Sequence, residues 1–440
     1  MTAKGSSRRL LTGELGISEW TLDAVEEAEG EVRGLFDAIE GVMEFNQYKV
    51  LRAFQDNRVS TMHFSWSTGY GYGDVGREAL ENVYAQVFGA QAALVRPIIV
   101  NGTHALTLAL TGILRPNDEL VSCTGKPYDT LDELIGTRGE GRGSLKDFGI
   151  AYRQVELRED GGIDYGGLER AITPKTGVAY LQRSTGYGFR KAITVKEIGE
   201  WASFVKSISP DAVCMVDNCY GEFIETMEPT EAGADVIAGS LIKNPGGGLA
   251  VGGGYIAGRA DLIEKVSCRM TSPGIGGECG LMFGQSRAML QGLFMAPAVV
   301  SGAVKGAVLC AKAFEGLGFE VCPKPGDLRS DIIEAVKLGS AEAVIAFCEG
   351  VQAAAPIDSH AVPVPDEMPG YGSPVIMAAG SFIQGSSIEL SADAPIREPY
   401  IVYFQGGLTY AHSKFGVMKA LQALKDKGLV PSKGGGPQDA

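Results

Sequence analysis

The chain has 440 residues, enough for two domains, and 45% of them are hydrophobic, as in an ordinary globular protein. Its 39 Lys and Arg residues stand against 53 Asp and Glu residues, a net charge of −14, which argues against nucleic acid or an anionic membrane as the main partner. The eight cysteines include no CxxC pair, and the histidines are too widely spaced for zinc ligands, so we expect no metal site. With no apolar secretory segment at the N-terminus, we expect a cytoplasmic protein that acts on a small molecule.

The first 64 residues show helical periodicity, and we assign residues 1–64 to an N-terminal helical arm. Ser18 is placed to cap the first helix of this pattern. The apolar positions that define the pattern are Ile17, Trp20, Leu22, Val25, Val32, Leu35, Phe36 and Ile39. A glycine-aromatic loop, "SWSTGYGYGDVG" at residues 65–76, follows the arm and precedes another helix.

Short apolar strands alternate with helices from about residue 90 to residue 258, which predicts an α/β domain with a mainly parallel sheet at 65–295. Ligands of such sheets bind at the carboxyl ends of the strands. The expected strand regions are 92–100, 118–123, 150–157, 176–183, 211–217, 234–240 and 248–258.

The pattern of residues 296–428 predicts a smaller α+β domain. Residues 429–440 have no apolar periodicity, which predicts a disordered tail. The apolar stretch at 292–314 contains Pro297 and Lys305, which favours a packed helix over a membrane span.

Lys243 lies at the end of one predicted strand, in "GSLIKNPGGG" at residues 239–248, and Asp217 ends another. A lysine with a depressed pKa can form a Schiff base with a carbonyl compound. A buried carboxylate needs a cation beside it, and the protonated ring nitrogen of pyridoxal phosphate is such a cation. The alternatives are a surface lysine and an aspartate that caps a turn.

Other residues near the predicted strand ends could hold an anion or a flat ring. Gly102 and Thr103 open a helix in "NGTHALTL", where backbone N–H groups favour a phosphate, and Ser240 could add a hydroxyl. Tyr128 follows a strand end, where its ring could stack on a cofactor. The first strand–helix turn lacks the GxGxxG fingerprint that an NAD-dependent enzyme would require.

The order Gly-Thr at a helix start, Tyr, Asp and Lys resembles that of fold-type I pyridoxal-phosphate enzymes. More closely, the sequence resembles the methionine γ-lyase-like proteins, relatives of the cystathionine-metabolising enzymes that are also described as aluminium-resistance proteins. The resemblance covers most of the chain, from "WSTGYGYGD" to "QGGLTYAH". Its most distinctive stretches are "VDNCYGEF", "GSLIKNPGGGLA", "MPGY" and "SIELSADAPIREPY".

The resemblance implies the aspartate aminotransferase fold, a three-layer large domain with a smaller C-terminal domain, and a role for each matching residue. Lys243 would bind the cofactor and shuttle the α-proton, Asp217 would hold the ring nitrogen, and Tyr128 would stack on the ring. Arg397 would bind the substrate α-carboxylate as a bidentate partner. The phosphate would be held by Gly102, Thr103 and Ser240, and further ring contacts would come from Gln182 or Arg183 and from Asn218.

One position departs from the cystathionine enzymes, which carry a Tyr-x-Arg motif that reaches the phosphate of a neighbouring subunit. Here Tyr72 keeps the hydroxyl, but Asp74 replaces the arginine and would repel a phosphate. Either Arg77 supplies the cation or the loop has another purpose. The resemblance still implies a homodimer or homotetramer with shared active sites.

The sequence therefore predicts a pyridoxal-phosphate-dependent lyase that cleaves a carbon–sulfur bond of an amino acid by β- or γ-elimination. An aminotransferase and a γ-replacement enzyme remain alternatives, because they use the same cofactor and carboxylate contacts. A cofactor-binding protein without turnover is a third possibility. The preferred amino acid and its leaving group depend on the shape of the substrate pocket.

Overall fold

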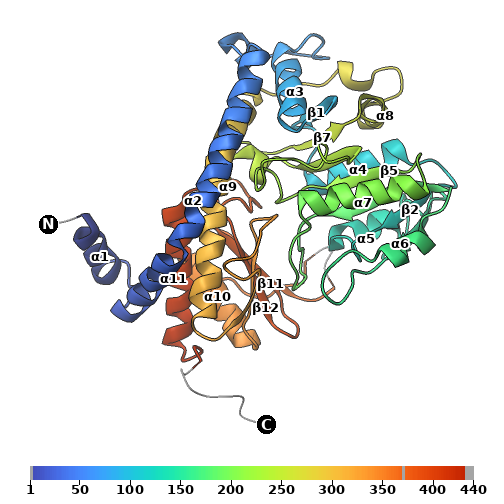
Figure 1. Ribbon diagram of the computed structural model, residues 1–440. Coiled ribbons are helices and arrows are strands. Elements are labelled where there is room, and N and C mark those ends of the chain that lie inside the picture. The colour runs from blue at the N-terminus through green and yellow to red at the C-terminus, as the bar shows by residue number, and fades with distance from the viewer. Residues whose placement is uncertain (1–2, 369–371, 432–440) are drawn as a thin grey trace. The chain divides into compact units, whose positions relative to one another are not determined.

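A computed structural model describes residues 3–368 and 372–431. The chain forms two compact units (Figure 1). Of the described residues, the seven-stranded unit comprises 42–186 and 191–298, and the five-stranded unit comprises 3–41, 187–190, 299–368 and 372–431. Most of the "MPGY" stretch and of the predicted C-terminal tail lie outside the described residues.

The seven-stranded unit contains one mixed sheet in the order β1-β7-β6-β5-β4-β2-β3. Strands β2 to β6 are parallel where they pair, and β7 runs antiparallel to both β1 and β6. The strands are β1 (Ala92–Arg96), β2 (Glu119–Ser122), β3 (Ala151–Gln154), β4 (Thr176–Gln182), β5 (Val213–Asp217), β6 (Val236–Ser240) and β7 (Gly254–Gly258). The expected region 92–100 is strand only to Arg96, because the chain turns from Pro97, whose ring nitrogen has no N–H to donate.

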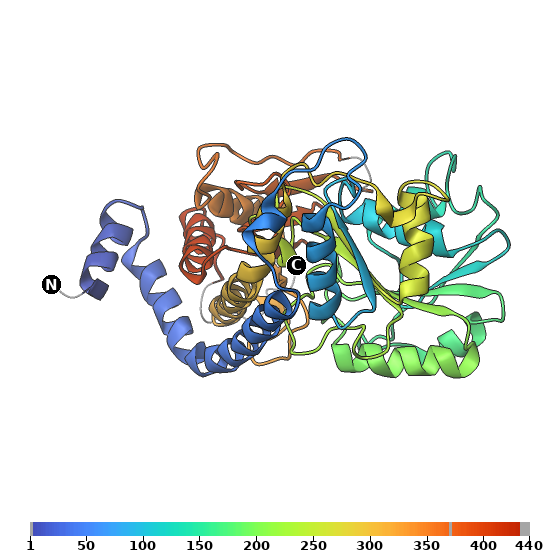
Figure 2. The same ribbon diagram turned by 90° about the horizontal axis from the view of Figure 1, so that it is seen from above.

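Helices cover both faces of this sheet. In Figure 2, α7 lies along one face and α4 and α8 lie on the other. The unit's helices are α3 (Val75–Val87), α4 (Gly102–Ile113), α5 (Asp132–Ile135), α6 (Tyr165–Ala171), α7 (Val195–Ile208) and α8 (Ala260–Met270), with short 3-10 turns at η1 (Thr61–Phe64), η2 (Asp129–Leu131), η3 (Asn244–Gly246) and η4 (Gly276–Glu278). The helix–sheet–helix layering matches the predicted three-layer α/β arrangement.

The five-stranded unit is built on an antiparallel sheet in the order β10-β11-β12-β9-β8. Its core joins α10, α11 and the C-terminal part of α9 to this sheet. Its strands are β8 (Glu320–Cys322), β9 (Glu334–Lys337), β10 (Val375–Ala378), β11 (Ser391–Pro395) and β12 (Ile401–Gln405), and its helices are α1 (Ala3–Gly13), α10 (Ala341–Ala353) and α11 (Tyr410–Asp426).

Two long helices, α2 (Glu19–Asp56) and α9 (Ser286–Glu315), contribute residues to both units. Ser18 accepts a hydrogen bond from the backbone N–H of Thr21, as expected for the residue before α2. Leu22, Val25 and Phe36 are buried as the helical pattern predicted, whereas Trp20 and Leu35 of the same pattern are exposed. Among the described helices, α9 alone is long and apolar enough to cross a membrane, and most of its apolar window is buried inside the protein.

The glycines after Lys243 pack against α9. A Cβ on Gly247 would clash with the carbonyl oxygen of Gly292 in α9, and a Cβ on Gly292 would clash with the carbonyl oxygen of Gly246. Gly247 also has a φ of 53°, in the left-handed region that favours glycine. The glycine run therefore lets a helix backbone lie directly against the segment that carries Lys243.

The buried side chain of Arg77 holds the loop at residues 65–76 in place. The Arg77 guanidinium is 2% exposed and donates hydrogen bonds to the carbonyl oxygens of Gly71 at 2.6 Å, Gly280 at 3.1 Å and Glu278 at 3.1 Å. Asp74 is buried and caps α3 by accepting a hydrogen bond from the Arg77 backbone N–H at 2.9 Å. Neither charge is presented at the surface of the loop, so the expectations that Asp74 repels a phosphate or that Arg77 binds one do not fit this unit.

Replacing Gly292 with Ala tests the helix contact. Alanine normally stabilises a helix by about 1 kcal/mol relative to glycine, but here the added Cβ meets the carbonyl of Gly246, and we expect the free energy of unfolding to fall by about 1–3 kcal/mol. Gly34 in α2 has open space around its Cβ position, so Gly34→Ala is the matched control and should be neutral or stabilising. Equal effects of the two changes in chemical denaturation would contradict the close contact.

Replacing Arg77 with Ala tests its structural role. The carbonyl oxygens of Gly71, Gly280 and Glu278 lose their charged donor, the first in a buried contact and the other two in half-buried contacts, so we expect a loss of about 2–4 kcal/mol in the free energy of unfolding of the purified protein. Tyr72→Phe, on the exposed part of the same loop, should leave that free energy unchanged. An Arg77→Ala variant as stable as the wild type would show that the guanidinium does not support the loop.

Candidate active site

Three parallel neighbours, β4, β5 and β6, end at the same edge of the seven-stranded sheet, with Gln182, Asp217 and Ser240 as their last residues. Helix α4 begins at this edge. A Cβ on Gly102 would lie 3.3 Å from the Cβ of Ser240 and 3.5 Å from the Sγ of Cys219. The structure therefore brings the start of α4 against the end of β6, as expected for parallel strands.

Thr103 joins this edge to the segment that carries Tyr128. The hydroxyl of Thr103 lies 2.9 Å from that of Thr130, and Tyr128 is half-buried at the start of this segment. Asn101 caps α4 by accepting a hydrogen bond from the backbone N–H of His104. The N–H groups at the beginning of α4 thus lie close to Ser240 and the Tyr128 segment.

Asp217 is buried in a polar cage at the end of β5. Its carboxylate accepts hydrogen bonds from the backbone N–H of Cys219 at 3.1 Å and from the Tyr180 hydroxyl at 3.2 Å. Burial raises the pKa of Asp217, although the charge of Lys243 and these hydrogen bonds act in the opposite direction. The carboxylate would consequently be stabilised by a further cation placed against it.

The Lys243 amine lies 3.9 Å from the centre of the Tyr220 ring. Burial lowers the pKa of Lys243, but Cys219, Tyr220 and Asp217 together raise it more, so this pKa lies above its ordinary value. The depressed pKa expected from the sequence is therefore not found in this structure. The physical reason is that Cys219 and Tyr220, followed by the Asp217 carboxylate, favour the charged amine more strongly than burial disfavours it.

Three neighbours of these residues were not identified from the sequence. Tyr220 and Cys219 follow Asp217 within "VDNCYGEF", a stretch in which the sequence analysis assigns cofactor contacts to Asp217 and Asn218 only. Tyr220 has a φ of 71°, a backbone conformation that an L-residue rarely adopts, and this turns its side chain in a direction that strand periodicity does not predict. Tyr180 lies two residues before the end of β4, and its reach to Asp217 depends on the strand pairing.

Arg183 lies in a network of buried polar side chains, and the ring contact considered from the sequence stays a prediction. Its guanidinium is fully buried and donates a hydrogen bond to the side-chain oxygen of Asn218 at 2.8 Å. It also forms ion pairs with Glu225 at 3.0 Å and Glu228 at 3.6 Å. Gln182 is buried at the end of β4, and its Oε1 has no hydrogen-bond partner among the described residues.

Tyr72 and Arg397 are not part of this cluster within either unit. Tyr72 is 66% exposed on the loop of the seven-stranded unit, and its ring centre lies 5.5 Å from that of Tyr70. Arg397 lies in the five-stranded unit, in the exposed turn between β11 and β12. It forms no ion pair with any residue that the structure describes, so a surface salt bridge does not explain it.

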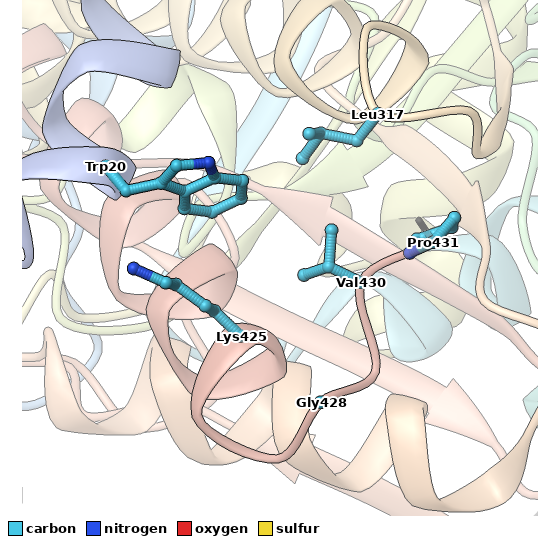
Figure 3. Close-up of a pocket in the computed structure, with 6 residues that line it drawn as sticks. All are labelled: Trp20, Leu317, Lys425, Gly428, Val430 and Pro431. Carbon is cyan, nitrogen blue, oxygen red and sulfur yellow. The ribbon is translucent and has the colours of Figure 1, made fainter. Parts of the chain in front are cut away.

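A cavity of about 410 Å³ in the five-stranded unit is a poor alternative site (Figure 3). Of its lining residues, Lys425 alone is titratable, and its amine lies 4.8 Å from the centre of the Trp20 ring. Within residues 3–368 and 372–431, no group of three or more His, Cys, Asp and Glu residues could hold a metal ion. The Asp217–Lys243 cluster remains the strongest candidate for chemistry.

Comparisons with known proteins show which proteins the chain resembles. The chain is 53% identical over 405 residues to the uncharacterized protein YnbB of Bacillus subtilis, covering 92% of this chain and 96% of that protein. The crystal structure of a carbon-sulfur lyase involved in aluminum resistance from Clostridium novyi shares 50% identity and a TM-score of 0.92, covering 96% of this chain and all of that one.

A more distant structure shows the wider fold class. The pyridoxal-5'-phosphate dependent protein YhfS of Escherichia coli is 17% identical with a TM-score of 0.59, covering 88% of this chain and 97% of that one. The fold is therefore the one predicted from the sequence, that of the pyridoxal-phosphate-dependent transferases. Residues 21–425 match the methionine gamma-lyase family, and the chain belongs to that family.

Proposed function

We propose that this protein is a pyridoxal-phosphate-dependent lyase that cleaves a carbon–sulfur bond of a sulfur-containing amino acid by β- or γ-elimination. The observation that carries the proposal is the meeting of Lys243, Asp217 and the start of α4 at one edge of the sheet. A lysine amine, a buried carboxylate and a helix N-terminus are the three groups needed to hold the aldehyde, the ring nitrogen and the phosphate of this cofactor.

The residues present fit the cofactor by their chemistry. Asp217 is a buried carboxylate whose pKa is raised by burial, so a protonated ring nitrogen would offset its cost. Gly102 leaves space at the N-terminus of α4, because a side chain at this position would crowd Ser240. We assign the phosphate to Gly102, Thr103 and Ser240, the ring face to Tyr128, and the aldehyde to Lys243.

Pyridoxal phosphate, when bound, would supply an electron sink for the charge that remains after an α-proton is removed. Lys243 is the base that removes this proton, since its amine is the basic group at the strand edge. A cation bound to Asp217 would offset the negative charge of that carboxylate, which is one of the causes that raise the pKa of Lys243. The pKa of the lysine would then fall. The carbon–sulfur bond of the substrate then breaks, a thiol leaves, and water converts the remainder to a 2-oxo acid and ammonia.

We also propose that the enzyme is a homo-oligomer that uses the loop at residues 65–76 for contact between subunits. Trp66, Tyr70 and Tyr72 are 75%, 73% and 66% exposed on this loop, which Arg77 holds firmly in place. Clustered exposed aromatic residues are typical of interfaces. Because Asp74 is buried, a neighbouring subunit would meet the Tyr72 hydroxyl and not a negative charge.

A panel of amino acids tests the proposed reaction. Methionine, homocysteine, cystathionine, cysteine and alanine are incubated with the purified protein and cofactor, and 2-oxo acid, ammonia and free thiol are measured together. We expect all three products from at least one sulfur amino acid, and none from Lys243→Ala, which lacks the amine. Oxo acid that forms without ammonia, and only when a second 2-oxo acid is supplied, would instead establish an aminotransferase.

Replacing Arg397 with Ala tests substrate binding. A bidentate contact to a carboxylate is worth about 2–3 kcal/mol, so we expect KM for the amino acid to rise by roughly 30-fold or more while cofactor binding is retained. Glu398→Ala, in the same exposed turn, is the control and should leave KM near the wild-type value. If Arg397→Ala also leaves KM unchanged, Arg397 does not bind the substrate.

A further inference from the structure

A buried glutamate, Glu222, lies behind the strand ends that carry the proposed site. Its side chain is fully buried, and Oε1 accepts a hydrogen bond from the Tyr255 hydroxyl at 2.7 Å. The other oxygen, Oε2, is buried and has no hydrogen-bond partner among the described residues. Glu222 also lacks an ion pair with any lysine, arginine or histidine in that part of the chain. A carboxylate in this environment would be a buried charge without compensation.

The charges around Glu222 favour its neutral form. Burial raises its pKa to about 8, the hydrogen bond from Tyr255 acts against this, and the negative charge of Glu228 adds to it. Arg183 also lowers this pKa but has the smallest of these effects, and its guanidinium forms ion pairs with Glu225 and Glu228. The titratable and charged groups that face Glu222 are Tyr84 from α3, Tyr255 from β7, Cys219 and Glu228 from the segment after β5, and Arg183 from the segment after β4.

Glu222 is connected to Lys243 through the backbone. The side chain of Asn244, the residue after Lys243, donates hydrogen bonds to the carbonyl oxygens of Tyr220 and Glu222, each at 3.0 Å. Glu222 Oε1 also lies against β6, because a Cβ on Gly239 would be 2.8 Å from it. The same carboxyl group thus contacts the strand that leads to Lys243 and lies in the turn that carries the Tyr220 ring.

We propose that Glu222 is a positioning residue of the active site, acting as a neutral carboxylic acid that holds the Tyr220–Phe223 turn against the Lys243 segment. Loss of its proton places an uncompensated charge beneath the turn and loosens the contact between the Tyr220 ring and the Lys243 amine. The proposal rests on the proposed function for the importance of Lys243. The protonation state of Glu222 itself does not depend on that function.

The first test compares Glu222→Gln with Glu222→Ala in the visible absorption of the protein titrated with pyridoxal phosphate. Glutamine keeps the shape and neutrality of the acid, so we expect wild-type absorption and affinity, whereas alanine should weaken cofactor affinity at least tenfold. Leu262→Ala, a buried change in α8 away from the site, is the control for general destabilisation and should keep the absorption. A Gln variant as impaired as the Ala variant would overturn the proposal, because it would show that the negative charge is required.

The second test follows melting temperature against pH and needs no turnover. The folded-state pKa of about 8 exceeds the ordinary value of 4.5, so the folded state holds a proton that the unfolded state releases between these values. This contribution to stability is fully present below pH 4.5 and is lost as pH rises through about 8. The melting temperature of Glu222→Gln relative to wild type should therefore rise as pH increases from 5 to 8.

The outcomes separate the two proposals. A constant difference in melting temperature across this pH range would overturn the neutral-acid assignment, whatever the protein binds. If the wild type develops no visible absorption with pyridoxal phosphate, the proposed function fails, and the positioning role fails with it. A pH-dependent melting difference in that case would still establish the buried neutral acid.

Discussion

The position of Lys243 depends on a contact between two stretches of glycine backbone. Gly246 and Gly247 lie directly on Gly292 of α9, at a separation that leaves no room for a Cβ on either side. Because close-packed backbone is stiff, this contact fixes residues 241–247, the segment that follows β6 and carries Lys243. The backbone of Lys243 is therefore held rigidly at the sheet edge, although its side chain has four flexible carbon–carbon bonds.

A second constraint is the placement of charge beneath this edge. Asp217 and Glu222 are both buried acids with raised pKa values, yet their surroundings differ. Burial raises the pKa of Asp217, while the charge of Lys243 and two hydrogen-bond donors act to lower it, and this suits a carboxylate that binds the protonated ring nitrogen of a cofactor. Glu222 accepts a hydrogen bond from a tyrosine and forms no ion pair with any residue that the structure describes, which suits a neutral acid. The difference suits these two carboxyl groups, five residues apart, to the separate roles that we propose for them.

The arginines of the seven-stranded unit show how burial decides what a charged residue does. Arg77 and Arg183 are both placed in sequence where a ligand contact could be expected. Both are buried, and they donate hydrogen bonds to backbone carbonyl oxygens in the case of Arg77 and to the side chains of Asn218 and Glu225 in the case of Arg183. Arg397 is exposed and has no ion pair among the described residues, so it remains available for an anionic substrate group.

The sequence by itself determined the fold class, because alternating strands and helices and the positions of Asp217 and Lys243 at strand ends are local features of the chain. It also indicated that Gly102 and Ser240 lie at one edge of the sheet, since the ends of parallel strands and the starts of the helices that follow them share that edge. Tertiary structure alone decided the surroundings of these residues. Segments that are distant in sequence pack together to place the Tyr220 ring against the Lys243 amine and to raise the pKa of that lysine. The same packing buries Glu222 without an ion pair among the described residues. No sequence spacing records such contacts.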